Sequence, residues 1–77
     1  MEFTMNTHAF YKHPNCTDTC IQVLKYFPIP GKDEAKVKVL WWRLKGGRLS
    51  HCMGIKEVFR KPITYWKLWK RLKEDTL

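Results

Sequence analysis

The chain has 77 residues, enough for one small domain (residues 1–77), and its four Trp, four Phe and three Tyr argue against intrinsic disorder. Its net charge is +8, and twelve of its fifteen basic residues lie between Lys36 and Lys73, where the one acid is Glu57. This asymmetry indicates an anionic partner, and the lack of an apolar run of about 20 residues excludes a membrane-spanning helix.

The N-terminal residues have neither the basic nor the apolar region of a secretory signal peptide. We therefore expect a cytoplasmic protein whose three cysteines are reduced thiols. We also expect residues 1–9 to form a flexible or loosely attached N-terminus.

The first half of the chain predicts two strands. Residues 10–13 form a short strand that ends at the turn pair Pro14-Asn15. The next segment, "CTDTCIQVLKYFPIPG", fits a helix with an apolar face at a period of 3.6 residues. Its β-branched and aromatic residues favour a strand, which the two prolines at positions 28 and 30 would end.

A second pair of strands is predicted after the polar turn at residues 31–34. The segment "KVKVLWWRLK" at positions 36–45 is the strongest strand pattern, and Gly46-Gly47 suits a hairpin turn, because glycine accepts positive φ. Residues 49–53 form the returning strand, and Gly54 marks a bulge or break. Residues 55–59 fit either a further strand or a turn of helix.

The C-terminal segment "PITYWKLWKRLK" predicts an amphipathic helix over residues 62–74. Pro62 suits the first helical position, and the tryptophans and leucines lie on one arc, opposite Lys and Arg. This helix has three interpretations: it packs on the sheet, it binds a partner, or it lies on a membrane surface.

These elements predict a mostly β fold with a C-terminal α-helix, as a small curled antiparallel sheet or an SH3-like barrel of four to five strands. The segments "YKHPNCTDTCIQVLKYFPIP" and "KVKVLWWRLKGG", followed by an amphipathic C-terminus, resemble those of small uncharacterised bacteriophage-encoded proteins. The resemblance implies a barrel-like fold in the cytoplasm of an infected host, and it transfers no known catalytic residue.

Adjacent tryptophans point to opposite faces of a strand. Trp41 therefore shares the core face with Val37 and Val39, whereas Trp42 lies on the face of Lys36 and Lys38. Trp42 either stacks on a nucleobase in a basic groove or is covered by the C-terminal helix, with Trp66, Trp69 and Leu72 packed over Leu40 and Trp42.

Metal binding and catalysis receive little support. The candidate zinc ligands are His13, Cys16, Cys20 and Cys52, but they contain one spaced pair where a zinc site needs two. The acids are scattered, and the sequence has neither a phosphate-binding glycine loop nor a nucleophile elbow. We expect no enzymatic activity, no cofactor and no metal.

The sequence thus predicts a small, non-enzymatic, basic binding module that contacts nucleic acid through phosphate and stacking contacts. The alternative is a phage-encoded protein that binds an acidic surface on a host defence or transcription component. The predicted nucleic-acid-binding residues are Lys36, Lys38, Trp42, Arg43, Lys45 and Arg48, with Lys67, Lys70 and Arg71 extending the patch.

Overall fold

Alternation of buried and exposed residues builds most of the chain into strands. A computed structural model describes residues 3–72. Its elements, in chain order, are β1 (Phe10–Lys12), β2 (Thr19–Pro28), β3 (Glu34–Lys45), β4 (Arg48–Pro62), α1 (Ile63–Trp66) and β5 (Lys70–Arg71). Within the described residues, no helix has the length and apolar character that a bilayer span requires.

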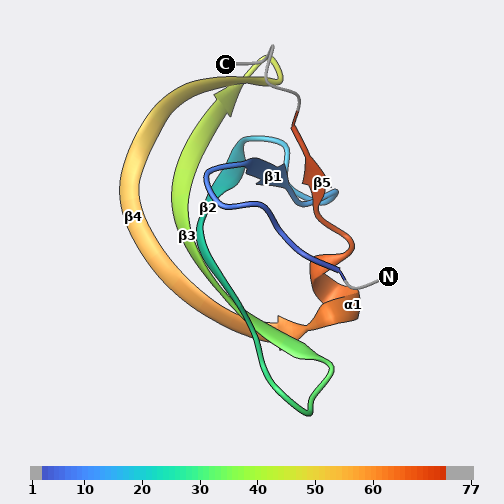
Figure 1. The fold of residues 1–77 in the computed structure, drawn as a ribbon. Helices are drawn as coiled ribbons and strands as arrows, with labels where there is room; N and C mark the ends of the chain where they lie inside the picture. The colour runs from blue at the N-terminus through green and yellow to red at the C-terminus, as the bar shows by residue number, and fades with distance from the viewer. Residues whose placement is uncertain (1–2, 73–77) are drawn as a thin grey trace.

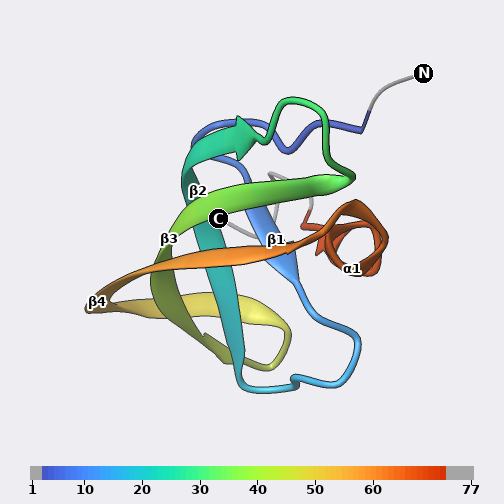
Figure 2. The same cartoon turned by 90° about the horizontal axis from the view of Figure 1, so that it is seen from below.

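The five strands form one antiparallel sheet in the order β4-β3-β2-β1-β5. The sheet curls strongly but does not close into a barrel, so β4 and β5 are its two edges (Figure 1). In both ribbon views α1 lies on the inner side of the curl (Figures 1 and 2). The predicted fold class, mostly β with a C-terminal helix, is confirmed, and the arrangement is the curled sheet.

The core fills the concave side of this sheet. Val23, Val37 and Val39 are fully buried, as period-2 alternation requires, and Trp66 of α1 covers them with 1% of its surface exposed. The Trp66 Nε1–H donates to the Ala35 carbonyl oxygen at 3.1 Å, so this buried indole leaves no polar group unpaired. Burial of each of these valine side chains stabilises the folded state by about 1.5–3 kcal/mol.

The N-terminal segment belongs to the core, so the expectation of a loosely attached N-terminus is wrong for residues 3–9. Met5 is 1% exposed within the core cluster. The Tyr26 hydroxyl donates to the Phe3 carbonyl at 2.9 Å, and residues 8 and 9 exchange backbone hydrogen bonds with Val23. An open sheet leaves apolar surface uncovered, and this segment covers part of it. Residues 1 and 2 lie outside the described range.

The C-terminal helix is one turn long, so the prediction of a helix over residues 62–74 is wrong within residues 67–72. After Trp66 the backbone tightens through bonds from Leu68 to Tyr65 and from Trp69 to Trp66, each spanning three residues. The chain then pairs with β1 as β5, and Leu72 N–H donates to the Phe10 carbonyl. Backbone hydrogen bonds between β5 and the edge of β1 take the place of those that a longer helix would make. Residues 73 and 74 lie outside the described range.

The β3–β4 hairpin follows the prediction closely. Gly46 and Gly47 have φ of 59° and 78°, the positive values that a two-residue hairpin turn needs. Gly54 has φ of 75° and lies where the β3–β4 register shifts. It is therefore a bulge within one continuous strand, and residues 55–59 continue that strand.

Candidate functional site

The adjacent tryptophans lie on opposite faces of β3, as the pleat predicts. Trp41 packs against the core, whereas the Trp42 ring meets Phe10 edge to face at 5.4 Å. The Trp42 Nε1–H also donates to the Gln22 side chain at 3.2 Å. The alternative in which the C-terminal helix covers Trp42 is wrong for Trp66 and Trp69, because both pack on the core side. Phe10 covers part of Trp42 instead.

The outer, convex face of the sheet carries a cluster of cations, which we call the basic face. Strand register places Lys36 between Phe27 and Arg60, and places Lys38 between Lys25 and Val58. Lys56 lies in the next row, opposite Leu40. All project away from the buried valines, because their neighbours in each strand point inward. The basic face comprises Lys25, Lys36, Lys38, Lys56 and Arg60.

Little negative charge balances this surface. Within residues 3–72 the basic face makes one salt bridge, from Arg60 Nε to Glu34 Oε1 at 2.8 Å. Lys25 and Lys38 stand directly opposite each other, and a like-charge cross-strand pair destabilises a sheet. Repulsion between the two ammonium groups destabilises the free protein. An anion bound between them would replace this repulsion with attraction.

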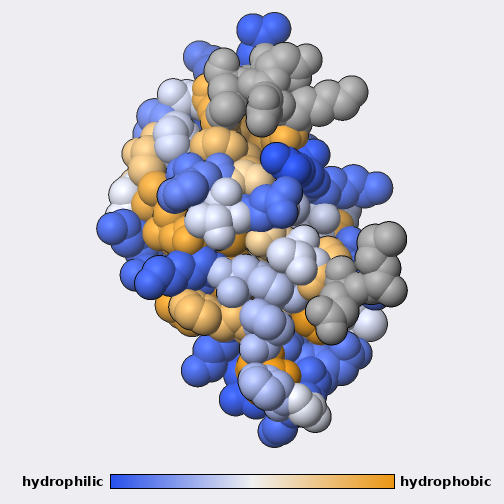
Figure 3. Space-filling model, viewed as in Figure 1, coloured by the Kyte–Doolittle hydropathy of each residue, from blue (hydrophilic) through white to orange (hydrophobic). Residues whose placement is uncertain are grey.

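An aromatic ring lies exposed at one end of the basic face. The Phe27 side chain is 46% exposed, beside Lys36. A groove of about 410 Å³ runs along it, lined by Phe27, Pro28, Ile29, Pro30, Lys36 and Arg60. Figure 3 shows hydrophobic and hydrophilic surface alternating along the side of the molecule that β4 forms. Phe27 is therefore better placed for stacking than Trp42, whose ring is partly covered.

The remaining predicted cations lie elsewhere on the molecule. Arg43, Lys45 and Arg48 are exposed toward the β3–β4 turn, where Lys45 and Arg48 pair. Lys67, Lys70 and Arg71 are exposed on the C-terminal segment, and β5 is separated from β3 by two strands. The structure thus brings Lys36 and Lys38 together with Lys25, Lys56 and Arg60, three cations that the sequence prediction missed.

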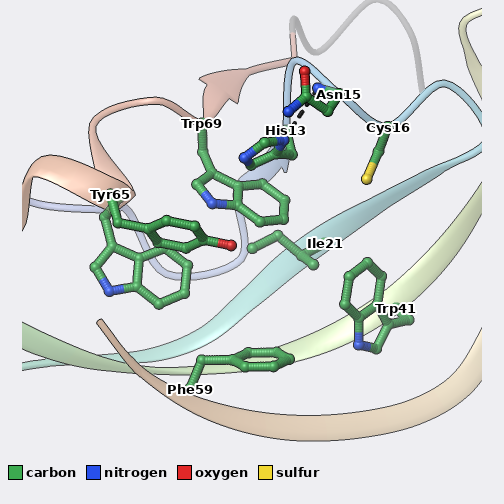
Figure 4. Close-up of a pocket in the computed structure, with 9 residues that line it drawn as sticks. His13, Asn15, Cys16, Ile21, Trp41, Phe59, Tyr65 and Trp69 are labelled. Atoms are coloured by element: carbon green, nitrogen blue, oxygen red, sulfur yellow. Dashed lines mark hydrogen bonds between the residues drawn. The ribbon is translucent and has the colours of Figure 1, made fainter. Parts of the chain in front are cut away.

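The concave side contains a second feature, which we call the aromatic pocket. It has a volume of about 320 Å³ and is lined by His13, Asn15, Cys16, Ile21, Trp41, Phe59, Tyr65, Trp66 and Trp69. Its walls come from β2, β3, β4, α1 and the segments that follow β1 and α1, and Figure 4 shows their rings gathered around Ile21. The sequence predicts Trp41 on the core face, but the packing alternative for Trp66 and Trp69 places them over Trp42 and not beside Trp41.

Polar contacts fix several of the pocket rings. The Trp41 Nε1–H donates to Glu57 Oε1 at 2.6 Å, and Lys61 Nζ lies 5.2 Å from the centroid of the Tyr65 ring. His13 Nδ1 accepts a hydrogen bond from the Asn15 backbone N–H at 3.0 Å. An imidazole that accepts a hydrogen bond at Nδ1 carries its proton on Nε2.

The four candidate zinc ligands do not converge. His13 and Cys16 line the aromatic pocket, Cys20 is fully buried, and Cys52 is exposed on β4 opposite Trp42. Among residues 3–72, no three His, Cys, Asp or Glu side chains form a group suited to a metal ion. Burial raises the pKa of Cys20 from 9.0 to about 11, with the Lys12 charge acting in the opposite direction, so this thiol is unreactive.

No family model, curated protein or solved structure matches this chain. Two surfaces of the fold combine features that suit binding. The basic face offers uncompensated positive charge next to an exposed ring, and the aromatic pocket offers a concave, ring-lined volume on the opposite side of the sheet.

Proposed function

We propose that the protein binds single-stranded nucleic acid on the basic face, with no strong sequence preference. The observation that carries the proposal is the cross-strand placement of Lys25 opposite Lys38, in the row next to Phe27, Lys36 and Arg60. Lysine and arginine neutralise backbone phosphates, while an exposed aromatic ring accepts any base by stacking. The basic face combines both contacts.

The exposed phenyl ring favours a single strand over a duplex. Base faces are accessible to a protein ring only where the bases are unstacked, as in single strands, loops and ends. Phe27 stands at the end of the cation rows and lines a groove together with Lys36 and Arg60. A strand that crosses the rows would place phosphates over the lysines and one base on Phe27.

Fluorescence anisotropy with a labelled mixed-sequence oligonucleotide tests this proposal. Affinity should fall with salt, and the double variant Lys25→Gln/Lys38→Gln should reduce the slope of log K against log salt by about 1.4, or about 0.7 for each lost phosphate contact. Phe27→Leu should weaken binding by about 1–3 kcal/mol, because it keeps the apolar volume but removes the stacking surface.

The matched control is Lys70→Gln/Arg71→Gln, which removes the same charge from β5 at the far edge of the sheet. This control should keep the wild-type slope and nearly the wild-type affinity. An equal loss in both double variants would mean that net charge, and not the basic face, governs binding. Absence of binding at low ionic strength would overturn the proposal outright.

An acidic surface on a host protein is the second candidate partner. It is favoured by the exposed apolar side chain of Val58, 57% accessible and directly beside Lys38, because protein interfaces combine apolar area with charge. A pull-down from host lysate distinguishes the two partners. Partners that persist after nuclease treatment support protein binding, whereas complete loss supports nucleic acid.

A further inference from the structure

The indole of Trp69, one of the rings that line the aromatic pocket, carries an unpaired hydrogen-bond donor. Its Nε1 atom is buried, and no acceptor for it exists within residues 3–72. A buried, unsatisfied donor costs about 1–3 kcal/mol, so almost all such groups in folded proteins are paired. Since Trp69 lines the pocket, a ligand that displaces the rings now covering Nε1 and brings an acceptor would remove this cost.

The other walls of the pocket limit what that ligand is. Trp41 and Phe59 pack edge to face at 6.4 Å, and His13 and Trp69 do the same at 5.1 Å. Edge-to-face pairs leave ring surfaces available for a further aromatic partner. Figure 4 shows the Tyr65 hydroxyl pointing toward Ile21. Within the described residues this hydroxyl makes no hydrogen bond, so it is a second polar group available to a ligand.

Charge argues against a cationic ligand, which ring-lined pockets often bind. The pocket lining contains no carboxylate, and Glu57, which contacts the lining residue Trp41, already accepts the Trp41 Nε1–H. Lys61 adds positive charge beside Tyr65, and the whole chain carries +8. A cation would also leave the Trp69 donor unpaired, because it has no acceptor to offer.

We infer that the aromatic pocket binds a nucleobase. A base is planar, stacks on indole and phenyl rings, and carries the ring nitrogen or carbonyl acceptors that Trp69 lacks. Its attached phosphate would be attracted by the positive charge of Lys61, which lies against the lining residue Tyr65. The volume of about 320 Å³ lies at the lower end of small-ligand sites, which fits one base and its sugar.

Two sources supply this ligand: a free nucleotide, or an unpaired base of a bound single strand. The second source rests on the proposed function, and β4 connects the two surfaces. Arg60 belongs to the basic face, whereas the neighbouring Phe59 points into the pocket. Because β4 is an edge strand, a nucleic-acid strand on the basic face reaches the pocket by passing one edge of the sheet.

The cysteines provide a site-specific assay for occupancy. Cys16 lines the pocket, Cys52 is exposed on the far part of β4, and Cys20 is buried. Alkylation followed by mass spectrometry should show AMP protecting Cys16 and leaving Cys52 unchanged. At ten times its Kd, AMP should slow Cys16 alkylation roughly tenfold, because about one site in eleven is then empty. The indole Nε1–H resonance of Trp69 should shift in the same titration.

Two small molecules serve as matched probes. Ribose 5-phosphate keeps the sugar and phosphate of AMP but lacks the base, and tetramethylammonium tests the cationic alternative. Neither should protect Cys16. Protection by ribose 5-phosphate equal to that by AMP, stronger protection by tetramethylammonium, or no protection by AMP at millimolar concentration would each overturn the inference.

Two substitutions separate stacking from hydrogen bonding. Phe59→Leu should weaken AMP binding roughly 5- to 150-fold, the loss expected for one base–aromatic contact. Trp69→Phe keeps a ring but removes the N–H, and should weaken binding roughly 2- to 12-fold. The variant Lys25→Gln/Lys38→Gln should leave AMP binding unchanged. Wild-type affinity in both Phe59→Leu and Trp69→Phe would contradict the proposed contacts.

The same assay with an oligonucleotide distinguishes the two proposals. Protection of Cys16 by AMP and by a bound oligonucleotide supports a base supplied by the single strand, and protection by AMP alone supports a free nucleotide. If an oligonucleotide binds without protecting Cys16, and AMP does not protect Cys16 either, the nucleobase site is overturned. Nucleic-acid binding on the basic face is then still supported. AMP protection without any oligonucleotide binding supports the nucleobase site and overturns nucleic-acid binding on the basic face.

Discussion

Cys20 illustrates how one buried thiol links stability to pH. Its side chain has no exposed surface, and burial raises its pKa from 9.0 to about 11, although the Lys12 charge favours the thiolate. In the unfolded chain the thiol ionises near its ordinary value. Between these two values the unfolded state binds fewer protons than the folded state, so the free energy of unfolding falls as pH rises.

The Cys20→Ala variant should lack this component of the pH dependence. In the wild type the contribution is complete below pH 9.0 and is lost as pH rises toward 11, up to about 2–3 kcal/mol. Urea unfolding at several pH values measures it. The exposed Cys52→Ala variant is the control, because it removes a thiol but leaves Cys20 in place. A Cys20→Ala profile parallel to that of Cys52→Ala would contradict the assignment.

For the individual residues 36–42 of β3, alternation predicted which face each side chain takes. The pattern placed Val37, Val39 and Trp41 inward and the lysines outward, and the structure agrees. It did not predict Phe27 as the exposed ring, because pairing between strands decides which side chains are neighbours. The register of Phe27 against Lys36 depends on a shift between Val23 and Lys25 that no local pattern encodes.

Strand β4 is long, exposed and at an edge of the sheet, a combination that invites pairing with other chains. Two features oppose such pairing. Cations occupy the strand at residues 56, 60 and 61, and Gly54 introduces a bulge in the left-handed region at φ of 75°. The bulge twists the strand and interrupts the flat edge that another chain would need.

Replacement of Gly54 should destabilise the protein through backbone strain alone. A Cβ at this position would meet no atom within 4 Å, so Gly54→Ala carries no steric clash. The left-handed conformation costs an ordinary residue about 1–2 kcal/mol, and asparagine tolerates it better. Thermal unfolding should therefore rank wild type above Gly54→Asn and Gly54→Asn above Gly54→Ala. Equal stability of the two variants would point to a cause other than φ.

The C-terminal segment shows why element boundaries resisted prediction. A spacing of three residues between Trp66, Trp69 and Leu72 satisfies both a helix and the tight turn that the chain adopts. The sequence alone does not reveal that β1 has a free edge beside this segment. Pairing of Lys70 and Arg71 with β1 supplies backbone hydrogen bonds that a longer helix would have supplied internally.

At the scale of the whole molecule, the fold covers its core without closing the sheet. The concave side is covered by α1 from one end of the chain and by residues 3–9 from the other, and both ends contribute a buried residue, Trp66 and Met5. A 77-residue chain buries a modest fraction of its surface, so each such contribution matters. The contribution of residues 3–9 to the core is visible only in the assembled sheet, because these residues carry no periodic pattern.

Met5→Ala should therefore destabilise the protein as a core substitution would, by about 2–5 kcal/mol. The Met5 side chain is 1% exposed and belongs to the cluster that includes Val23, Val37 and Trp66. The adjacent Thr4 is exposed, so Thr4→Ala should change the free energy of unfolding by no more than about 0.5 kcal/mol. Chemical denaturation monitored by tryptophan fluorescence measures both. A Met5→Ala protein as stable as Thr4→Ala would mean that the N-terminal segment lies on the sheet without stabilising it.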